Sequence, residues 1–432
     1  MDLRYTSLAF FFFGFLEFFC YNIIISGSQD ILAGTNAPTS LVLFIGIVPI
    51  CAVVGIAPYF VQEISYGLRI AFGVVIGVAG FVLVAYVENV KWKLTGVGLV
   101  TLSMGAIEIS FLGLMSYFES TVVSSYSAGT GVGFFIAPLY YIAMTTWLCV
   151  SPKITIVLVA LLLPLYLLSY YIVDKSMQDG SSQDGGGVAY TKLESSDTED
   201  FQERSKEKRN ELKAMNTVSA KEGLSWKEKF RVLRKMLYIV ALQEFIGYHS
   251  EYLIIQSVIS TIAYKNAPFR PRDHYQYYII IFMFGELIGR CHRSLLSFIK
   301  PSWSYQPTPA SLWVFAVLEM LHLFFFIFES WYRFLPNIVS TLVLCITAGI
   351  FIGLLFSNAV EVLHASFRGK HRELAISFFL SPSYVAITMS AIVGLYVEPR
   401  LFEHCTSIIS NSAYCVTRSK SLVDITAKCG IK

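Results

Sequence analysis

Long apolar runs constrain this chain more than any other feature. The sequence repeatedly continues for about 18–25 residues with few charges, which is the length that a helix needs to cross a hydrocarbon core of about 30 Å. Of its 432 residues, 55% are hydrophobic and 15% are charged, whereas soluble domains average about 25% charged. An open sheet cannot satisfy its backbone groups in lipid, so strands are not expected. The sequence therefore predicts an all-α polytopic membrane protein.

We expect about eleven transmembrane helices, one for each apolar run. The runs are 6–26, 38–60, 67–87, 95–117, 126–149, 154–173, 237–263, 276–298, 309–330, 337–358 and 373–397. The sequence divides into an N-terminal six-helix bundle (1–173), a cytosolic polar loop (174–235), a C-terminal five-helix bundle (236–398) and a tail (399–432). This layout is typical of major-facilitator-like transporters, which bind their solute near the midplane between two bundles.

The polar loop ends in the stretch "LSWKEKFRVLRKML". Ser225 and Glu228 have the spacing of a capping box, which predicts that a helix begins there. Trp226, Phe230 and Leu233 fall on one face of that helix, among lysines and arginines. A basic amphipathic helix of this kind is expected to lie on the surface of an anionic leaflet.

Positive charges predict the orientation, because cytosolic loops are rich in lysine and arginine. The basic loop 174–235 then places the N-terminus in the cytosol and the C-terminus in the lumen, and the first luminal loop (28–40) has no lysine or arginine. The charges that disagree are Lys91, Lys93, Lys265, Arg270 and Arg272. In a luminal tail, two of Cys405, Cys415 and Cys429 could form a disulfide.

Ionisable residues inside the spans are the candidates for function, because each costs about 2.5–3.5 kcal/mol at mid-helix without a partner or a cavity. These residues are Glu17, Glu108, Glu244, Glu251, Glu286, Arg290, Glu319 and His322. On span 237–263, one face carries Glu244, Tyr248, Glu251, Tyr252 and Gln256, and His249 points elsewhere. This face predicts a cavity wall that binds a polar solute or relays protons. The alternative is hydrogen bonding that only holds the bundle together.

Two further pairs lie one helical turn apart. Glu286 and Arg290 can form an ion pair within their helix. Such a pair is either structural or leaves Arg290 to bind an anionic substrate through its forked donors. Glu319 and His322 can pair in the same way, and a structural role is favoured there. We find no sequence motif for a hydrolase, a phosphate-binding loop or a metal site, so no enzyme activity and no cofactor is expected. The net charge of +3 gives no indication of nucleic-acid binding.

The stretch YHSEYLIIQ (248–256) resembles the battenin family's signature YFAEYxxNQG, with matches at Tyr248, Glu251, Tyr252 and Gln256. The resemblance extends from about residue 10 to residue 400. Further matching residues are Gly14, Tyr21, 30–32, Glu108, 111–112, 127–131, Tyr275, Tyr278, Gly285, Arg290, 334–336, Gly349, Gly353, Asn358, 371–373 and 394–395.

The resemblance implies a lysosomal or vacuolar membrane protein with a major-facilitator-like fold. The family is implicated in the export of glycerophosphodiesters, in basic amino-acid transport and in the control of lysosomal pH. This sequence departs from the family pattern at several intramembrane positions. Glu17 and Phe18 replace paired asparagines, Ile255 replaces the signature's asparagine, and Glu286 replaces an apolar residue. A family glutamate and a family aspartate are Ala348 and Ser383 here.

We therefore expect an alternating-access transporter of the lysosomal membrane that exports a small polar metabolite of the glycerophosphodiester class. The expected substrate-binding residues are Glu108, Tyr248, Glu251, Tyr252, Gln256 and Arg290, and the expected proton-coupling residues are Glu17, Glu251 and Glu286. One alternative is a transporter of basic amino acids such as arginine, whose glutamates bind the cation. Another is a non-transporting membrane scaffold that regulates lysosomal pH and trafficking through partners on the polar loop.

A sorting signal is a separate expectation. Tyr190-Thr-Lys-Leu193 in the polar loop has the tyrosine-x-x-hydrophobic form that adaptor complexes bind. This form also occurs often by chance.

Overall fold

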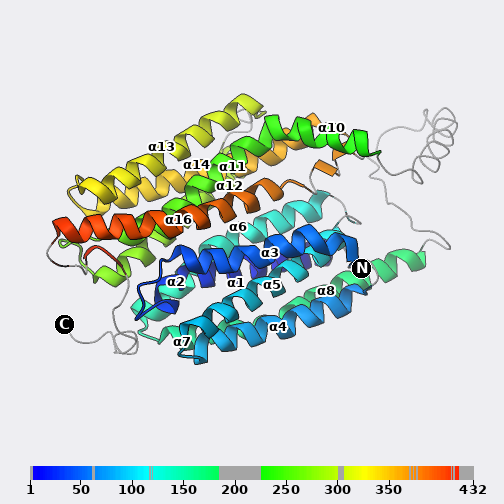
Figure 1. The fold of residues 1–432 in the computed structure, drawn as a ribbon. Helices are drawn as coiled ribbons and strands as arrows, with labels where there is room; N and C mark the ends of the chain where they lie inside the picture. Colours follow the sequence, from blue (N-terminus) through cyan, green and yellow to red (C-terminus); the bar gives the residue numbers. More distant parts are fainter. Residues whose placement is uncertain are drawn as a thin grey trace.

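The computed structural model describes residues 3–60, 64–115, 118, 120–183, 225–299, 306–368, 371–372, 374–375, 378–409, 411 and 414–417. Regular structure in these residues is helical throughout. The helices run roughly parallel and antiparallel to one another along one direction (Figure 1). The all-α fold predicted from the apolar runs is confirmed.

The N-terminal half consists of α1 (Leu3–Ser26), α2 (Ser28–Ile31), α3 (Ser40–Phe60), α4 (Tyr66–Tyr86), α5 (Val90–Met115), α6 (Ser120–Ile142), the π-helical turn η2 (Ala143–Trp147), α7 (Pro152–Ala160) and α8 (Leu165–Gln183). The C-terminal half consists of α10 (Trp226–Met236), η4 (Leu237–Ala241), α11 (Leu242–Leu253), η5 (Ile254–Val258), η6 (Ile259–Thr261), α12 (Pro271–Ile299), α13 (Pro309–Tyr332), α14 (Ile338–Ser366) and α16 (Ser381–Ile408).

Eight helical segments within the described ranges are long and apolar enough to cross a membrane. Three further passes complete the fold. In α3, Ser40–Val53 is an apolar helical stretch. The pass 226–261 is divided by the π-helical turns η4 and η5. In α12, the first turn is polar and Glu286 and Arg290 follow, so its apolar run is interrupted by charges.

Two passes differ from the predicted spans. The sixth was expected as one helix over 154–173, but a turn at 161–164 separates α7 from α8. This turn contains Pro164, which has no N–H to donate to a helix. The seventh begins earlier than expected, because α10 continues through η4 into α11 without a loop. The capping box is present, with Glu228 N donating to Ser225 Oγ and Ser225 N donating to Glu228 Oε2. Hydrogen bonds from Ser225 hold the pKa of Glu228 below its usual value.

The most extensive helix packing in the N-terminal bundle is that of α1 on α6, and in the C-terminal bundle that of α12 on α14. Glycine makes both contacts possible, because small residues let helix backbones approach each other. A Cβ at Gly129 of α6 would collide with the carbonyl of Phe11 on α1, and a Cβ at Gly349 of α14 would collide with the carbonyl of Phe282 on α12.

The two bundles meet along a seam where α3 packs on α16 and α6 packs on α12. We call the end of the molecule where α1 begins and α8 ends the proximal end, and the end where α16 ends the distal end (Figure 1). The proximal and distal ends are opposite ends of the molecule, because a chain that makes an odd number of passes begins and ends at opposite ends.

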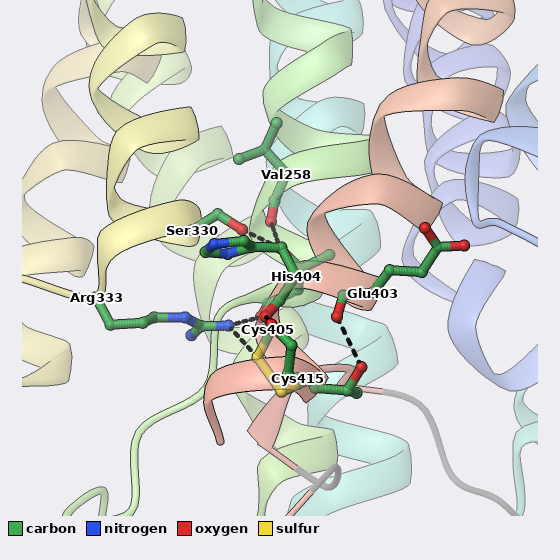
Figure 2. Close-up of a disulfide and its surroundings, with 10 residues drawn as sticks. Val258, Ser330, Arg333, Glu403, His404, Cys405 and Cys415 are labelled. Carbon is green, nitrogen blue, oxygen red and sulfur yellow. Dashed lines mark hydrogen bonds between the residues drawn. A yellow bond between two sulfur atoms is a disulfide. The ribbon is translucent and has the colours of Figure 1, made fainter. Parts of the chain in front are cut away.

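At the distal end, Cys405 and Cys415 form a disulfide (Figure 2). Arg333 at the end of α13 donates through Nη2 to the carbonyl of Thr261, 2.5 Å away, and to Cys405 Sγ. Thr417 donates from its backbone N and its Oγ1 to the carbonyl of Ser260, at 3.0 Å each. The segment after α16 is thus attached to the distal ends of η6 and α13, all in the C-terminal bundle.

Candidate substrate-binding site

A cavity of about 60 Å³ lies between the two bundles. By the criterion that one water needs about 10–15 Å³, it has room for roughly four to six waters. The N-terminal bundle contributes Glu17, Phe18, Tyr21, Ile47, Ile50, Met104, Glu108 and Phe134. The C-terminal bundle contributes Tyr248, Tyr252, Arg290, Phe356, Leu380, Ser383, Tyr384 and Ile387. A largely apolar wall with a few polar groups is typical of a small-molecule site.

Two carboxyl groups form one part of the wall. Glu17 on α1 and Glu108 on α5 are buried, and their carboxyl groups lie in electrostatic range of each other. Two neighbouring carboxylates repel each other, so the pair is more stable when it shares one proton. Tyr126 Oη donates to Glu17 Oε2 at 3.1 Å. Tyr384 Oη donates to Glu108 Oε1 at 2.6 Å, and this bond crosses the seam because Tyr384 lies on α16.

Arg290 on α12 supplies the positive charge. Its Nε and Nη2 both donate to Glu286 Oε1, at 2.8 and 2.6 Å. The guanidinium lies over Phe356 of its own bundle, 3.9 Å from the ring centre, and 4.8 Å from the ring centre of Phe134 on α6. Cation–π contacts stabilise a desolvated arginine. The predicted pair of Glu286 and Arg290 is therefore formed, and Arg290 also lines the cavity.

The polar face of α11 divides between the cavity and the interior of the C-terminal bundle. Tyr248 and Tyr252 line the cavity, and Tyr248 Oη accepts from Arg290 Nη2 at 3.4 Å. Glu251 does not line the cavity, because it projects about 100° away from the neighbouring Tyr252 around the helix axis. Its carboxyl oxygens are buried, have no hydrogen-bond partner, and lie in electrostatic range of Glu286 and Glu319.

Gln256 also lies outside the cavity. Its Nε2 donates to Tyr275 Oη at 2.9 Å, and that hydroxyl is 3.1 Å from Ser28 Oγ on α2. The π-helical turn η5 contains Gln256, so the regular 3.6-residue spacing used to align it with Tyr248 does not hold there. Gln256 belongs to the contacts that close the distal end.

That distal closure consists of buried polar contacts between the bundles. Arg272 on α12 donates to both oxygens of Asp30 on α2, from Nε at 3.0 Å and from Nη2 at 2.6 Å. Glu398 on α16 accepts from Thr39 N at 2.6 Å and from Thr39 Oγ1 at 2.8 Å. Arg272, which disagreed with the positive-inside rule, is thus neutralised by a buried aspartate.

Other predicted contacts have different outcomes. Glu319 and His322 do not pair, because His322 contacts the Leu318 carbonyl and Thr347 Oγ1 at 2.9 Å each, and both oxygens of Glu319 lack a partner. Their side chains point in different directions although they lie on one helix.

Glu244 accepts from Ser383 Oγ at 3.2 Å. Tyr190 and Leu193 of the sorting motif lie outside the described residues. No cluster of three potential metal ligands occurs in the described part of the chain.

Sequence reasoning missed Tyr126, Tyr384, Phe134 and Phe356. Tyrosines within apolar spans are a signal that could have indicated the first two. The phenylalanines carry no signal of their own, since the chain has 34 of them.

Comparison with known proteins decides the family. The family model described as CLN3 protein matches residues 8–404. The chain belongs to the CLN3 protein family. Protein btn1 of Schizosaccharomyces pombe is 29% identical over 400 residues, which cover 92% of this chain and 93% of that protein. Battenin of Canis lupus familiaris is 25% identical over 369 residues, which cover 83% of this chain and 76% of battenin.

Solved transporter structures share the fold. A bacterial homologue of the human lysosomal transporter Spinster, in an inward-facing and unoccupied conformation, superposes with a TM-score of 0.57 at 14% identity, covering 92% of this chain and 82% of that one. The POT-family transporter PepTSo superposes with a TM-score of 0.59 at 12% identity, covering 98% and 94%. The major-facilitator-like fold is thereby established for this battenin-family membrane protein.

Proposed function

We propose that this protein is an alternating-access transporter that exports a small anionic metabolite of the glycerophosphodiester class from a lysosome or vacuole and contributes to the pH of that compartment. The observation that carries the proposal is Arg290, a buried arginine that lines the cavity between the bundles. A guanidinium presents forked donors that match the oxygens of a phosphate. Membership of the CLN3 protein family supports the lysosomal or vacuolar membrane.

The seam supports alternating access. Contacts that cross it at the distal end are individual side-chain bonds, such as Arg272 with Asp30 and Thr39 with Glu398. Rocking of one bundle against the other would break these bonds and open the cavity on that side. In our proposal the distal end faces the lumen, because the basic helix α10 lies at the opposite end. The present cavity is smaller than the 300 Å³ or more of typical ligand sites, so it corresponds to a contracted state.

A basic amino acid is the second candidate substrate. The observation that favours it is the carboxyl pair of Glu17 and Glu108 in the same cavity. A cationic side chain could bind there after the shared proton is released.

Transport by the purified full-length chain in liposomes tests both candidates. We expect flux of radiolabelled glycerophosphoglycerol and a loss of that flux in Arg290→Ala. Arg400→Ala is the matched control, because its side chain is 81% exposed and lies outside the cavity. Flux of arginine that depends on Glu108 instead would favour the second candidate. If neither solute moves, both transport functions fail and the scaffold hypothesis gains.

A further inference from the structure

Glu286 has an arrangement that a purely structural ion pair does not require. Arg290 donates twice to one oxygen of Glu286, and the other oxygen, Oε2, is buried and has no hydrogen-bond partner among the described residues. Arg290 keeps Nη1 free of hydrogen bonds within the described residues, and its side chain lines the cavity. An anion in the cavity could reach the guanidinium through Nη1, and it would then compete with Glu286 for the single positive charge of Arg290.

The surroundings of this pair contain more acid than base. Ionisable groups in electrostatic range of Glu286 or Arg290 are Cys291 on their own helix, Glu244, Tyr248, Glu251 and Tyr252 on α11, and Glu319 on α13. Helices α14 and α6, which pack on α12, present Phe356 and Phe134 to the guanidinium. The side chains of Glu286 and Arg290 are only 1% and 8% exposed.

Charge balance limits what this cluster can hold. A buried charge without a partner costs several kcal/mol, so groups in such a place neutralise instead. One arginine can balance one carboxylate. Glu251 and Glu319, whose four oxygens have no partner, therefore carry protons while Glu286 balances Arg290. If an anion pairs with Arg290 instead, Glu286 no longer has a positive charge that balances it and must also be neutral.

We propose that Glu286 is an exchangeable counter-ion: an anion that enters the cavity replaces it on Arg290, and Glu286 then takes up one proton. Before exchange, Arg290 and Glu286 carry one positive and one negative charge. After exchange, the anion supplies the negative charge and Glu286 is neutral, so one proton accompanies each anionic charge. The proton enters with the solute, and Glu251 and Glu319 are the carboxyl groups that can pass it on. This inference rests on the proposed function, because it requires an anionic solute in the cavity.

Two measurements test this proposal separately: the affinity for an anionic probe, and the number of protons moved with that probe. The purified full-length chain is titrated with glycerophosphoglycerol, and proteoliposomes with an internal pH-sensitive dye report the protons moved with the labelled probe. In wild type we expect one proton per probe. Glu286→Gln should bind the probe about tenfold more tightly, since a charge-assisted competitor is removed, and should move it without protons. Glu251→Gln should keep the wild-type affinity and lose proton movement.

Two further variants guard the interpretation. Glu286→Asp keeps the charge on a shorter side chain and replaces Glu286→Gln as the test variant if Glu286→Gln does not fold. Its affinity for the probe and its proton movement should lie between those expected for wild type and for Glu286→Gln. Glu403→Gln, an exposed carboxylate at the distal end, should match wild type in both measurements. The inference is overturned if Glu286→Gln retains wild-type affinity and proton movement, or if neither protein binds the probe. Binding that tightens in Glu286→Gln while wild type shows no flux would support the exchange and reject transport.

Discussion

Arg272 of α12 and Asp30 of α2 form an ion pair that joins the two bundles at the distal end, with 2.6 Å between Nη2 and Oδ2. Asp30 Oδ2 also accepts from Tyr141 Oη of α6 at 2.8 Å. The Asp30 side chain is 3% exposed and the Arg272 side chain 21%, so solvent screens the pair little. Separation of the bundles at this end requires that the pair breaks.

Asp30→Asn should favour opening at the distal end, because Arg272 loses the charge that holds it against the N-terminal bundle. Breaking a buried pair from one side costs about 3–5 kcal/mol, most of it from the charge left unpaired. The measurement is labelling of Ile47→Cys, a cavity residue, by a membrane-impermeant maleimide applied from the distal side. The background replaces the free cysteines Cys20, Cys51, Cys291 and Cys345. Labelling should be faster in Asp30→Asn, and an unchanged rate would show that the pair does not hold this end closed.

Tyr384→Phe should destabilise the contact between the two bundles without leaving a cavity, because only the hydroxyl group is removed. It removes the 2.6 Å bond to Glu108, which crosses the seam. A lost hydrogen bond to a buried carboxyl costs about 1–3 kcal/mol. Tyr126→Phe is the matched control, since its bond to Glu17 lies within the N-terminal bundle. Both variants should lower the melting temperature, but only Tyr384→Phe should change the labelling rate of Ile47→Cys. Equal rates in the two variants would contradict this role of Tyr384.

Gly349→Ala should impair folding of the C-terminal bundle. Its Cβ would collide with the backbone of Phe282, and backbone cannot rotate away as a side chain can. Overpacking of this kind costs about 1–3 kcal/mol. The yield of monodisperse protein and the melting temperature in detergent report the effect. Gly98→Ala is the control, because the nearest atom to its added Cβ is 3.7 Å away. A normal melting temperature in Gly349→Ala would mean that α12 and α14 can separate at little cost.

Cys415→Ser should release the segment after α16 from the distal end. A disulfide that closes a loop of 10 residues stabilises a fold by roughly 2–3 kcal/mol in the chain-entropy account. We expect a lower melting temperature for the variant than for wild type under non-reducing conditions, because the disulfide is absent. Reduction of wild type should lower the melting temperature at least as much, because it also breaks the disulfide of Cys149. A variant as stable as wild type would show that Arg333 and Thr417 suffice to hold this segment.

The apolar runs alone predicted the helical fold and the number of passes, because the thickness of lipid dictates the length of each run. Breaks inside a pass were harder to predict, since the turn at Pro164 and the π-helical turn η5 interrupt the regular helix without ending the apolar run. Local spacing grouped Tyr248 with Tyr252, and the structure places both in the cavity. Spacing failed for Gln256, which lies inside the π-helical turn η5. Contacts such as that of Glu108 with Tyr384 join residues 276 positions apart and leave no local pattern.

The continuity of α10 with α11 has a mechanical consequence. Trp226 and Phe230 of α10 are 81% and 69% exposed, among basic side chains that suit a membrane surface. Because no loop interrupts the chain between them and Tyr252, a tilt that the surface imposes on α10 must either turn the tyrosines that line the cavity or be absorbed in η4. A tilt that η4 does not absorb would therefore carry the lipid composition of one leaflet to the side chains that line the cavity.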